Sequence, residues 1–395
     1  MKKSIVILIS LVFCLFLIGC GEKTKVEEIT NDSTAITDNS EEDNDSNIKI
    51  EDSDKSDENG ADGNESLETD ENKKDEDDSE NENSEQVAEN SNLPKSKLNG
   101  FPYEEDELSK RVICISIDNH PKARPQAGLS LAEIIYEFEV EGPYTRYMGV
   151  FQTEEPKRIG PVRSARPYLI ESALSYDALF CHCGGSNDAF KMLSNLAVAN
   201  IDGLYTSSYW RYNSTGKYAP HNLYTTIPML RDYAKRANYR SEADFEGFDF
   251  NDKDMNLSDD DDQATIISID YNKENNTTYE FEEDLKKYAR FKDGKIDYDE
   301  NTGVQLFAKN IIVIKVNKTV LDDEGRLALT VVGNGNGYYF TNNKKIDITW
   351  EKTTSKAELK LYDGKTELKL NPGSTWIQVI SAKTEIDVDE VNIDE

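Results

Sequence analysis

The side chains best suited to chemistry lie in short polar motifs that follow apolar runs in the middle of the chain. In α/β proteins, catalytic and ligand-binding groups usually lie in loops at the ends of strands. The catalytic candidates are Asp118, His182 and His221, because two histidines and an orienting carboxylate form an acid–base set. Hydrogen-bonded structural histidines are the alternative interpretation. Further ligand-binding candidates occupy the same motifs: Asn119, His120, Arg146, Arg163, Arg166, Trp210, Arg211 and Asn222.

Two arginines, Arg163 and Arg166, are the strongest candidates for binding an anion. They lie three residues apart at the start of a helix predicted over residues 164–178, so both side chains would face the same way. The positive end of the helix dipole would add to their attraction for an anion. The pair would then clamp a carboxylate or phosphate, as found in peptidoglycan stem peptides or teichoic acid. The alternative is internal ion pairing with acidic residues of the same domain: Glu133, Glu137, Glu139 or Glu141.

Two other motifs resemble a metal site and a phosphate-binding loop, but their spacing does not support either one. Cys181 and Cys183 would share one face of a strand while His182 points to the other, and no second ligand pair completes a zinc site. We therefore expect no metal and no cofactor. The same-face spacing also makes a mutual disulfide unfavourable. The run Gly333-Asn-Gly-Asn-Gly337 resembles a phosphate loop, but no helix follows it, so we expect a hairpin turn.

The elements that must position these motifs alternate between strand and helix in the first half of the folded region. The apolar run Arg111–Ile117 ends in a turn cluster, as a buried strand does. Further strands are predicted at residues 134–140, 145–152 and 178–183, with helices at 164–178, 186–196 and 226–237. The alternation predicts an α/β domain with a mixed sheet over residues 99–250.

The second half of the folded region is predicted to be rich in strands. An acidic segment, residues 248–263, separates the two halves. Strand patterns follow at residues 265–271, 278–281, 310–316, 327–332, 337–341, 345–350, 358–362 and 376–380. This pattern predicts a β-rich domain over residues 264–382, followed by an acidic tail over residues 383–395 whose last dozen residues we expect to be frayed.

The N-terminus has the pattern of a bacterial lipoprotein signal. Lys2 and Lys3 precede an apolar run, Ile5–Ile18, that is shorter than the roughly 20 residues needed to span a bilayer. The run ends in Leu-Ile-Gly-Cys20, which has the order of a lipobox. We expect a signal peptide over residues 1–19, cleavage before Cys20 and lipidation of its thiol; an uncleaved signal anchor is the alternative. Acyl chains on Cys20 would hold the chain to the cell membrane on the extracellular face.

The segment after Cys20 predicts a tether. Residues 21–98 contain 27 acidic and 8 basic residues, a net charge of −19, and no aromatic residue. Such a composition buries too little apolar surface to offset its ordering entropy, so we expect a disordered acidic linker over residues 20–98. The net charge of the whole chain, −32, argues against nucleic acid as a partner.

Several phrases of the folded region resemble the YerB-like family of Gram-positive lipoproteins. They are IDNHPKARPQAGLSLAEIIYE, VEGPYTRYMGVFQ, IGPVRSARPY, GGSNDAF, APHNLYTT, DDEGRL, GNGYYF and LNPGSTWIQV. The resemblance covers most of residues 108–380 and keeps the order of both domains. It implies an envelope location and a two-domain architecture built on a domain of unknown function, and it implies no reaction.

Two functional hypotheses follow from these patterns. The first is a non-enzymatic envelope lipoprotein whose folded head binds peptidoglycan, teichoic acid or an envelope protein. The second is an enzyme acting on cell-wall material through Asp118, His182 or His221, with Arg163 and Arg166 holding the substrate. Convergence of these side chains on one open site would favour a ligand-binding or catalytic role, whereas dispersed or internally paired side chains would disfavour it.

Overall fold

The computed structural model describes residues 93–389. The predicted signal peptide (residues 1–19), the lipidated Cys20, the linker up to residue 92 and the tail from residue 390 lie outside the described residues. Within residues 93–389, no helix is both long enough and apolar enough to cross a bilayer.

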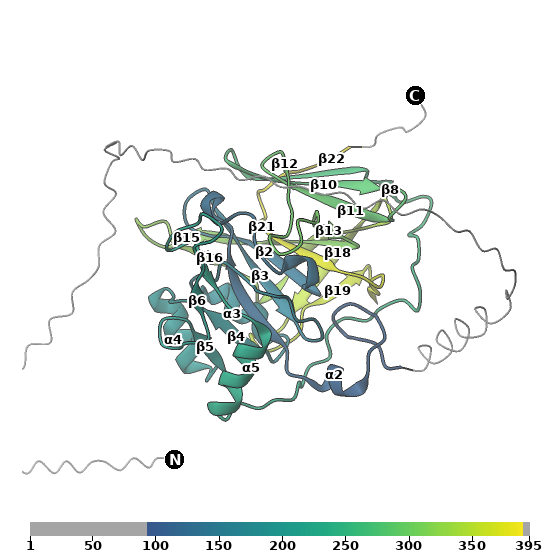
Figure 1. The fold of residues 1–395 in the computed structure, drawn as a ribbon. Helices are drawn as coiled ribbons and strands as arrows, with labels where there is room; N and C mark the ends of the chain where they lie inside the picture. The colour runs from purple at the N-terminus through teal and green to yellow at the C-terminus, as the bar shows by residue number, and fades with distance from the viewer. Residues whose placement is uncertain (1–92, 390–395) are drawn as a thin grey trace, which may run out of the picture. The chain divides into compact units, whose positions relative to one another are not determined.

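The described residues form two main sheets with a few short helices (Figure 1). The first half contributes β1 (Ile113–Asp118), β2 (Ile134–Glu139), β3 (Thr145–Phe151), β4 (Leu179–His182), β5 (Asn200–Asp202), β6 (Trp210–Arg211) and β7 (Leu223–Tyr224). Its helices are α2 (Glu105–Ser109), α3 (Pro167–Leu174), α4 (Asn187–Asn195) and α5 (Ile227–Arg236), with short 3-10 turns η1 (Pro121–Ala123) and η2 (Leu129–Leu131).

The second half is built from strands. In chain order they are β8 (Asp262–Gln263), β9 (Ile266–Asn272), β10 (Asn275–Glu282), β11 (Lys287–Lys292), β12 (Lys295–Ile296), β13 (Phe307–Ala308), β14 (Asn310–Val316), β15 (Lys318–Val320), β16 (Leu327–Leu329), β17 (Gly333–Thr341), β18 (Lys344–Lys352), β19 (Lys360–Asp363), β20 (Thr366–Glu367), β21 (Thr375–Ser381) and β22 (Ile386–Asp389). The predicted α/β half followed by a β-rich half is confirmed.

A single mixed sheet runs through both halves. Its order is β20-β19-β18-β17-β14-β21-β2-β3-β1-β4-β5, with β8 paired to β18. The junction is β21, which pairs in parallel with β14 on one side and with β2 on the other. The sequence patterns assigned the strands to two halves but did not indicate that β21 joins them edge to edge.

Both faces of this sheet are covered, which explains why every residue of β1, β2 and β3 is buried. On one face, apolar side chains of α3 and α4 pack against Cys114, Tyr136 and Met148. On the other face, the antiparallel sheet β12-β11-β10-β9-β22 packs against Ile135 and Tyr147, and α5 packs over the region of β1 and β4.

The helix boundaries follow from local capping. Ser186 accepts a hydrogen bond from the Ala189 backbone N–H and begins α4, as its position in the sequence predicted. Thr226 caps α5 in the same way. The helix predicted over residues 164–178 is shorter than expected, because the chain stays extended up to Arg166 and turns helical only at Pro167.

Two predictions about the second half are wrong. The Gly333–Gly337 run is not a hairpin turn but the first part of strand β17, paired with β18 along its whole length. The tail is not frayed throughout, because Ile386–Asp389 forms β22 and pairs with β9.

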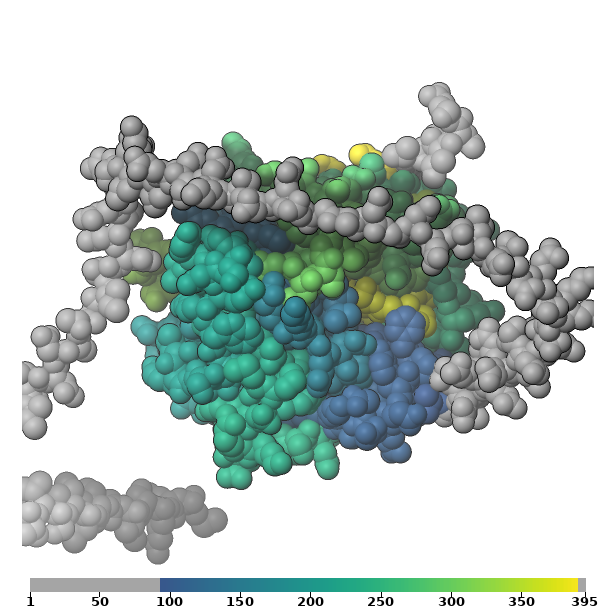
Figure 2. Space-filling view, in the orientation of Figure 1, coloured from purple at the N-terminus to yellow at the C-terminus, as the bar shows by residue number. Residues whose placement is uncertain are grey.

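The first described residues pack against the second half of the chain. The Gly373 backbone N–H donates to the carbonyl of Asn99, and Phe250, which pairs with Leu370 of the second half, lies against Gly100. In the space-filling view the start of the described chain, in blue, adjoins yellow residues of the second half (Figure 2).

Candidate functional site

The centre of the candidate site is a hydrogen-bonded pair of Asp118 and His221. Asp118 is the last residue of β1, and His221 lies in the turn that precedes β7. The His221 Nδ1 lies 2.7 Å from the Asp118 Oδ2, and the Asp118 side chain is 5% exposed. A carboxylate on Nδ1 leaves Nε2 as the nitrogen available to a ligand or a proton. Of the candidates Asp118, His182 and His221, the structure thus brings Asp118 and His221 into contact.

His120 extends this pair. Its ring stacks on the His221 ring with centroids 4.4 Å apart, and the centroid of the tilted Tyr144 ring lies 4.5 Å from that of His120. The His120 backbone N–H donates to the Asp118 Oδ1, so the loop after β1 closes over the carboxylate. Burial and then the neighbouring His221 lower the pKa of His120, which keeps its ring neutral near neutral pH. Tyr144 was not among the predicted residues, and only its position after the Gly142-Pro143 turn marks it in the sequence.

Two arginines supply positive charge to the cluster. The Arg163 Nε lies 3.5 Å from the Asp118 Oδ2, and the Arg163 side chain is 30% exposed. Arg146 lies opposite Asp118 in the β1–β3 ladder and donates from Nη1 to the carbonyl of Ser164 at 2.7 Å. The buried Nε of Arg146 has no hydrogen-bond partner among the described residues. Burial opposes ionisation of Asp118, but the His221 hydrogen bond and the charges of Arg163 and Arg146 together lower its pKa.

Two predicted residues lie outside this cluster. His182 is fully buried, and its ring nitrogens contact the Gly184 carbonyl at 2.8 Å and the Asn200 Oδ1 at 3.2 Å. Arg166 forms a two-pronged ion pair with Glu141, with N···O distances of 2.6 and 2.9 Å. Arg163 and Arg166 do not face the same way, because the chain between them is extended rather than helical. Arg146 takes the place beside Arg163 that the spacing had suggested for Arg166.

The remaining ligand-binding candidates support the loops rather than face the cluster. Asn119 is fully buried; its side chain donates to Thr145 and accepts hydrogen bonds from Arg124 and Gln126.

Arg211 and Asn222 brace the turn that carries His221. The Arg211 Nη1 donates to the carbonyl of Pro220 and to the side chain of Asn222. Trp210 neighbours this brace in β6, and Trp210 and Arg211 pair with Tyr224 and Leu223 of β7. These contacts position His221 beside Asp118.

Two family models match the chain. Residues 98–240 match the N-terminal domain and residues 267–377 match the C-terminal domain of a family described as "Protein of unknown function (DUF3048)". The chain belongs to the DUF3048 family. The match includes both halves in their expected order, so the family and the two-domain architecture implied by the sequence phrases are confirmed.

A curated relative and a solved structure extend this assignment. The DUF3048 chain is 29% identical over 299 residues to "Putative lipoprotein YerB" of Bacillus subtilis (strain 168), which covers 74% of this chain and 86% of the relative. It also resembles the crystal structure of the YerB protein from Bacillus subtilis, with 28% identity and a TM-score of 0.68 over 74% of this chain and 99% of that chain.

The atoms that remain available define what this DUF3048 site can do. Both Nη groups of Arg163 and the Nε2 atoms of His120 and His221 have no hydrogen-bond partner within residues 93–389. A guanidinium with two free amino groups binds a carboxylate or phosphate with two parallel hydrogen bonds. The site therefore presents one anion-binding fork beside one Asp-oriented imidazole. In the described part of the chain, no group of three or more His, Cys, Asp or Glu side chains is arranged to hold a metal ion.

Proposed function

We propose that this chain is a lipoprotein anchored to the extracellular face of the cell membrane through Cys20, whose head binds an anionic component of the cell envelope. Support for the anchor comes from the lipobox order before Cys20 and from homology to a protein that is named as a lipoprotein. Replacing Cys20 by Ser should abolish incorporation of labelled palmitate and release the chain from the membrane fraction. Retention of label in Cys20→Ser would contradict this anchor.

The binding role rests on one observation, the free guanidinium fork of Arg163 beside Asp118 and His221. Asp118 balances one of the two positive charges from Arg146 and Arg163, so the cluster keeps one positive charge within a chain of net charge −32. A carboxylate or phosphate at the Arg163 fork would balance that charge. Peptidoglycan stem peptides and teichoic acid carry these groups, and they define the proposed ligand class.

Binding is tested with the full chain in detergent and purified cell walls that contain or lack teichoic acid. Arg163→Gln should weaken retention by about tenfold or more, because a hydrogen bond to a charged group contributes about 1.5–3 kcal/mol. Arg236→Gln is the matched control, since Arg236 is exposed on α5 and carries the same charge. Equal retention of the two variants on cell walls would contradict the proposed site. If Arg163→Gln weakens retention only on walls that contain teichoic acid, the bound group is phosphate.

A second function, hydrolysis of cell-wall material, is favoured specifically by the Asp118–His221 pair. A carboxylate on Nδ1 holds the ring in the tautomer whose Nε2 accepts a proton from water. If the pair is a general base, His221→Gln should lower the release of soluble wall fragments by a factor of about 10²–10⁴. Retention of walls without any release of fragments would leave binding as the function.

A further inference from the structure

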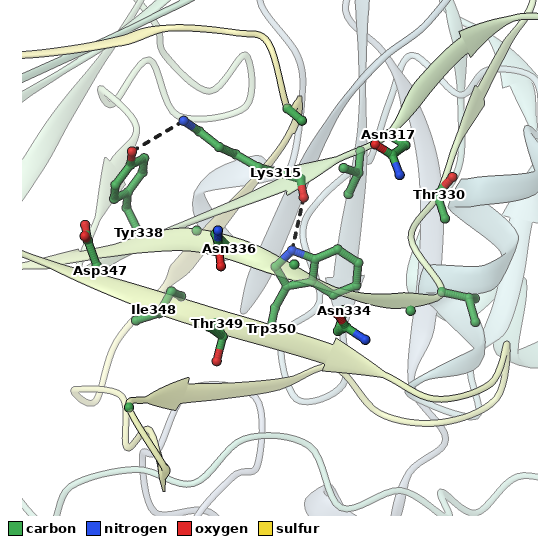
Figure 3. Close-up of a pocket in the computed structure, with 17 residues that line it drawn as sticks. Lys315, Asn317, Thr330, Asn334, Asn336, Tyr338, Asp347, Ile348, Thr349 and Trp350 are labelled. Carbon is green, nitrogen blue, oxygen red and sulfur yellow. Dashed lines mark hydrogen bonds between the residues drawn. The ribbon is translucent and has the colours of Figure 1, made fainter.

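A groove of about 690 Å³ lies in the second half of the chain, away from Asp118, where the glycine-rich run of β17 begins (Figure 3). Strand β17 pairs with β14 only from Gly337 to Phe340, whereas its earlier residues pair with β18 alone. The two strands therefore separate beyond Gly337. The groove lies in the space between them, with Lys315 on one side and residues 333–336 on the other.

The indole of Trp350 holds the strands apart. Trp350 lies opposite Gly335 in the β17–β18 ladder, and its Nε1 donates to the Lys315 carbonyl at 3.2 Å (Figure 3). The indole N–H thus takes up the Lys315 carbonyl, which would otherwise accept a backbone hydrogen bond if the β14–β17 ladder continued. A Cβ on Gly335 would lie 2.7 Å from the Trp350 Nε1, so glycine is required for the indole to cross the strand. The packing of Trp350 against the strand, and not a hairpin turn, therefore explains why glycine is needed at position 335.

The groove displays polar side chains that have no internal partner. Asn317, Thr330, Asn334, Asn336 and Thr349 are all exposed and line the groove. Among residues 93–389, none of these five side chains forms a hydrogen bond with another residue. Amides and hydroxyls both donate and accept hydrogen bonds, so these side chains together suit a ligand whose groups also donate and accept hydrogen bonds.

The charges of the groove favour a neutral ligand. Its charged side chains are Lys315 and Asp347, which balance each other, and the Lys315 ammonium lies against the Tyr338 ring and hydroxyl. A phosphate polymer would meet no cluster of cations here. The large apolar residues that line the groove include Val316, Ile348 and Trp350, which are already buried in the core, so they leave little apolar surface to cover the large side chains of a peptide.

We propose that this groove is a binding site for a neutral, hydroxyl-bearing glycan chain, contacted by Asn334, Asn336 and Thr349. The glycines of β17 present no side chains, so a sugar ring can approach the strand backbone closely. The groove volume lies within the usual 300–1,000 Å³ of ligand sites. This site differs in place and in ligand charge from the one at Asp118, and it does not depend on the function proposed there.

The test is calorimetric titration of the full chain in detergent with two uncharged probes, the tetramer of N-acetylglucosamine and maltotetraose. At least one probe should bind, and the double variant Asn334→Ala with Asn336→Ala should weaken that binding about tenfold, since each lost neutral hydrogen bond costs about 0.5–1.5 kcal/mol. Asn195→Ala, an exposed asparagine at the end of α4, is the matched control and should leave binding unchanged. Because Asn334 and Asn336 are exposed and unpaired, the double variant should keep the unfolding midpoint of the parent chain.

Three results would overturn the proposal. The first is the absence of binding by either probe at millimolar concentration. The second is binding that the double variant leaves unchanged. The third is binding of an extended peptide that slows hydrogen exchange of the backbone amides of residues 333–336 and has the same affinity for the parent chain and the double variant. That result would show that the groove binds polypeptide rather than glycan.

Discussion

The buried ion cluster around Glu137 should contribute several kcal/mol to the free energy of unfolding. Glu137 of β2 is fully buried, with its carboxylate 2.5 Å from the Arg290 Nη2 and 2.7 Å from the Lys292 Nζ of β11. Arg290 is also paired with Asp297, and its guanidinium lies 4.1 Å from the Trp376 ring centroid. Glu137→Gln preserves shape but removes the negative charge shared by two buried cations. Removing one partner of a buried ion pair costs about 3–5 kcal/mol of the free energy of unfolding.

The pKa of Glu137 leads to a similar magnitude. Burial acts to raise this pKa, but Lys292 and Arg290 overcome that effect and lower it from 4.5 to about 2. This lowering corresponds to a contribution on the order of 3 kcal/mol, because one pKa unit is about 1.4 kcal/mol. The contribution is fully present above about pH 4.5 and is lost as the pH falls towards 2.

The assay is urea unfolding of the full chain at pH 7 and at pH 3, with Glu367→Gln as the control. Glu367 pairs with Lys360 at the surface, where both side chains are at least 40% exposed, so its loss should cost at most about 1 kcal/mol. Glu137→Gln should be several kcal/mol less stable than this control at pH 7, and the gap should narrow at pH 3. If the two variants unfold at the same urea concentration at pH 7, the reasoning is wrong.

Three further results are expected. Burial raises the pKa of Glu133 to about 7, so the fold loses stability as the pH rises from about 4.5 to 7. Glu133→Gln should therefore have a higher thermal midpoint than the parent chain at pH 8. Equal midpoints at that pH would contradict this reasoning. Gly337→Ala should lower the unfolding midpoint markedly, because the new Cβ would lie 2.0 Å from the Val313 carbonyl oxygen, and an unchanged midpoint would show that β14 moves freely. Asp118→Asn should strengthen cell-wall retention severalfold if Arg163 binds an anion, whereas the same change would abolish fragment release if the Asp118–His221 pair is a base.

The sequence patterns predicted the elements well where burial follows hydropathy. Strand β14 was expected at residues 310–316 and has those bounds, because it is apolar and lies in the middle of a covered sheet. Strand β11 was missed for the opposite reason. Its inward side chains include Arg290 and Lys292, which are buried against Glu137, so the polar residues of this strand point to the core. Hydropathy cannot indicate a strand whose buried partner is a carboxylate on a distant strand.

The candidate site could be predicted in part. Asp118 was a candidate because it follows a buried apolar strand, and His221 because it lies in a short polar motif that could be oriented by Asp118. The second arginine was misassigned, since the argument for Arg166 assumed helical spacing through a segment that is extended. Arg146 lies beside Arg163 only because β3 pairs antiparallel with β1, and a ladder register cannot be read from one strand alone.

The position of β21 has a consequence for the order in which the chain folds. During synthesis the N-terminal end emerges first, yet the strand that completes the edge of β2 begins only at Thr375. Until that residue is available, β2 is an open sheet edge, which is prone to pairing with other chains. The first half of the protein must therefore wait for nearly all of the second, and chains that end before residue 375 should aggregate rather than fold as a smaller unit. This topology also makes folding slow, because its central pairing joins segments far apart in the chain.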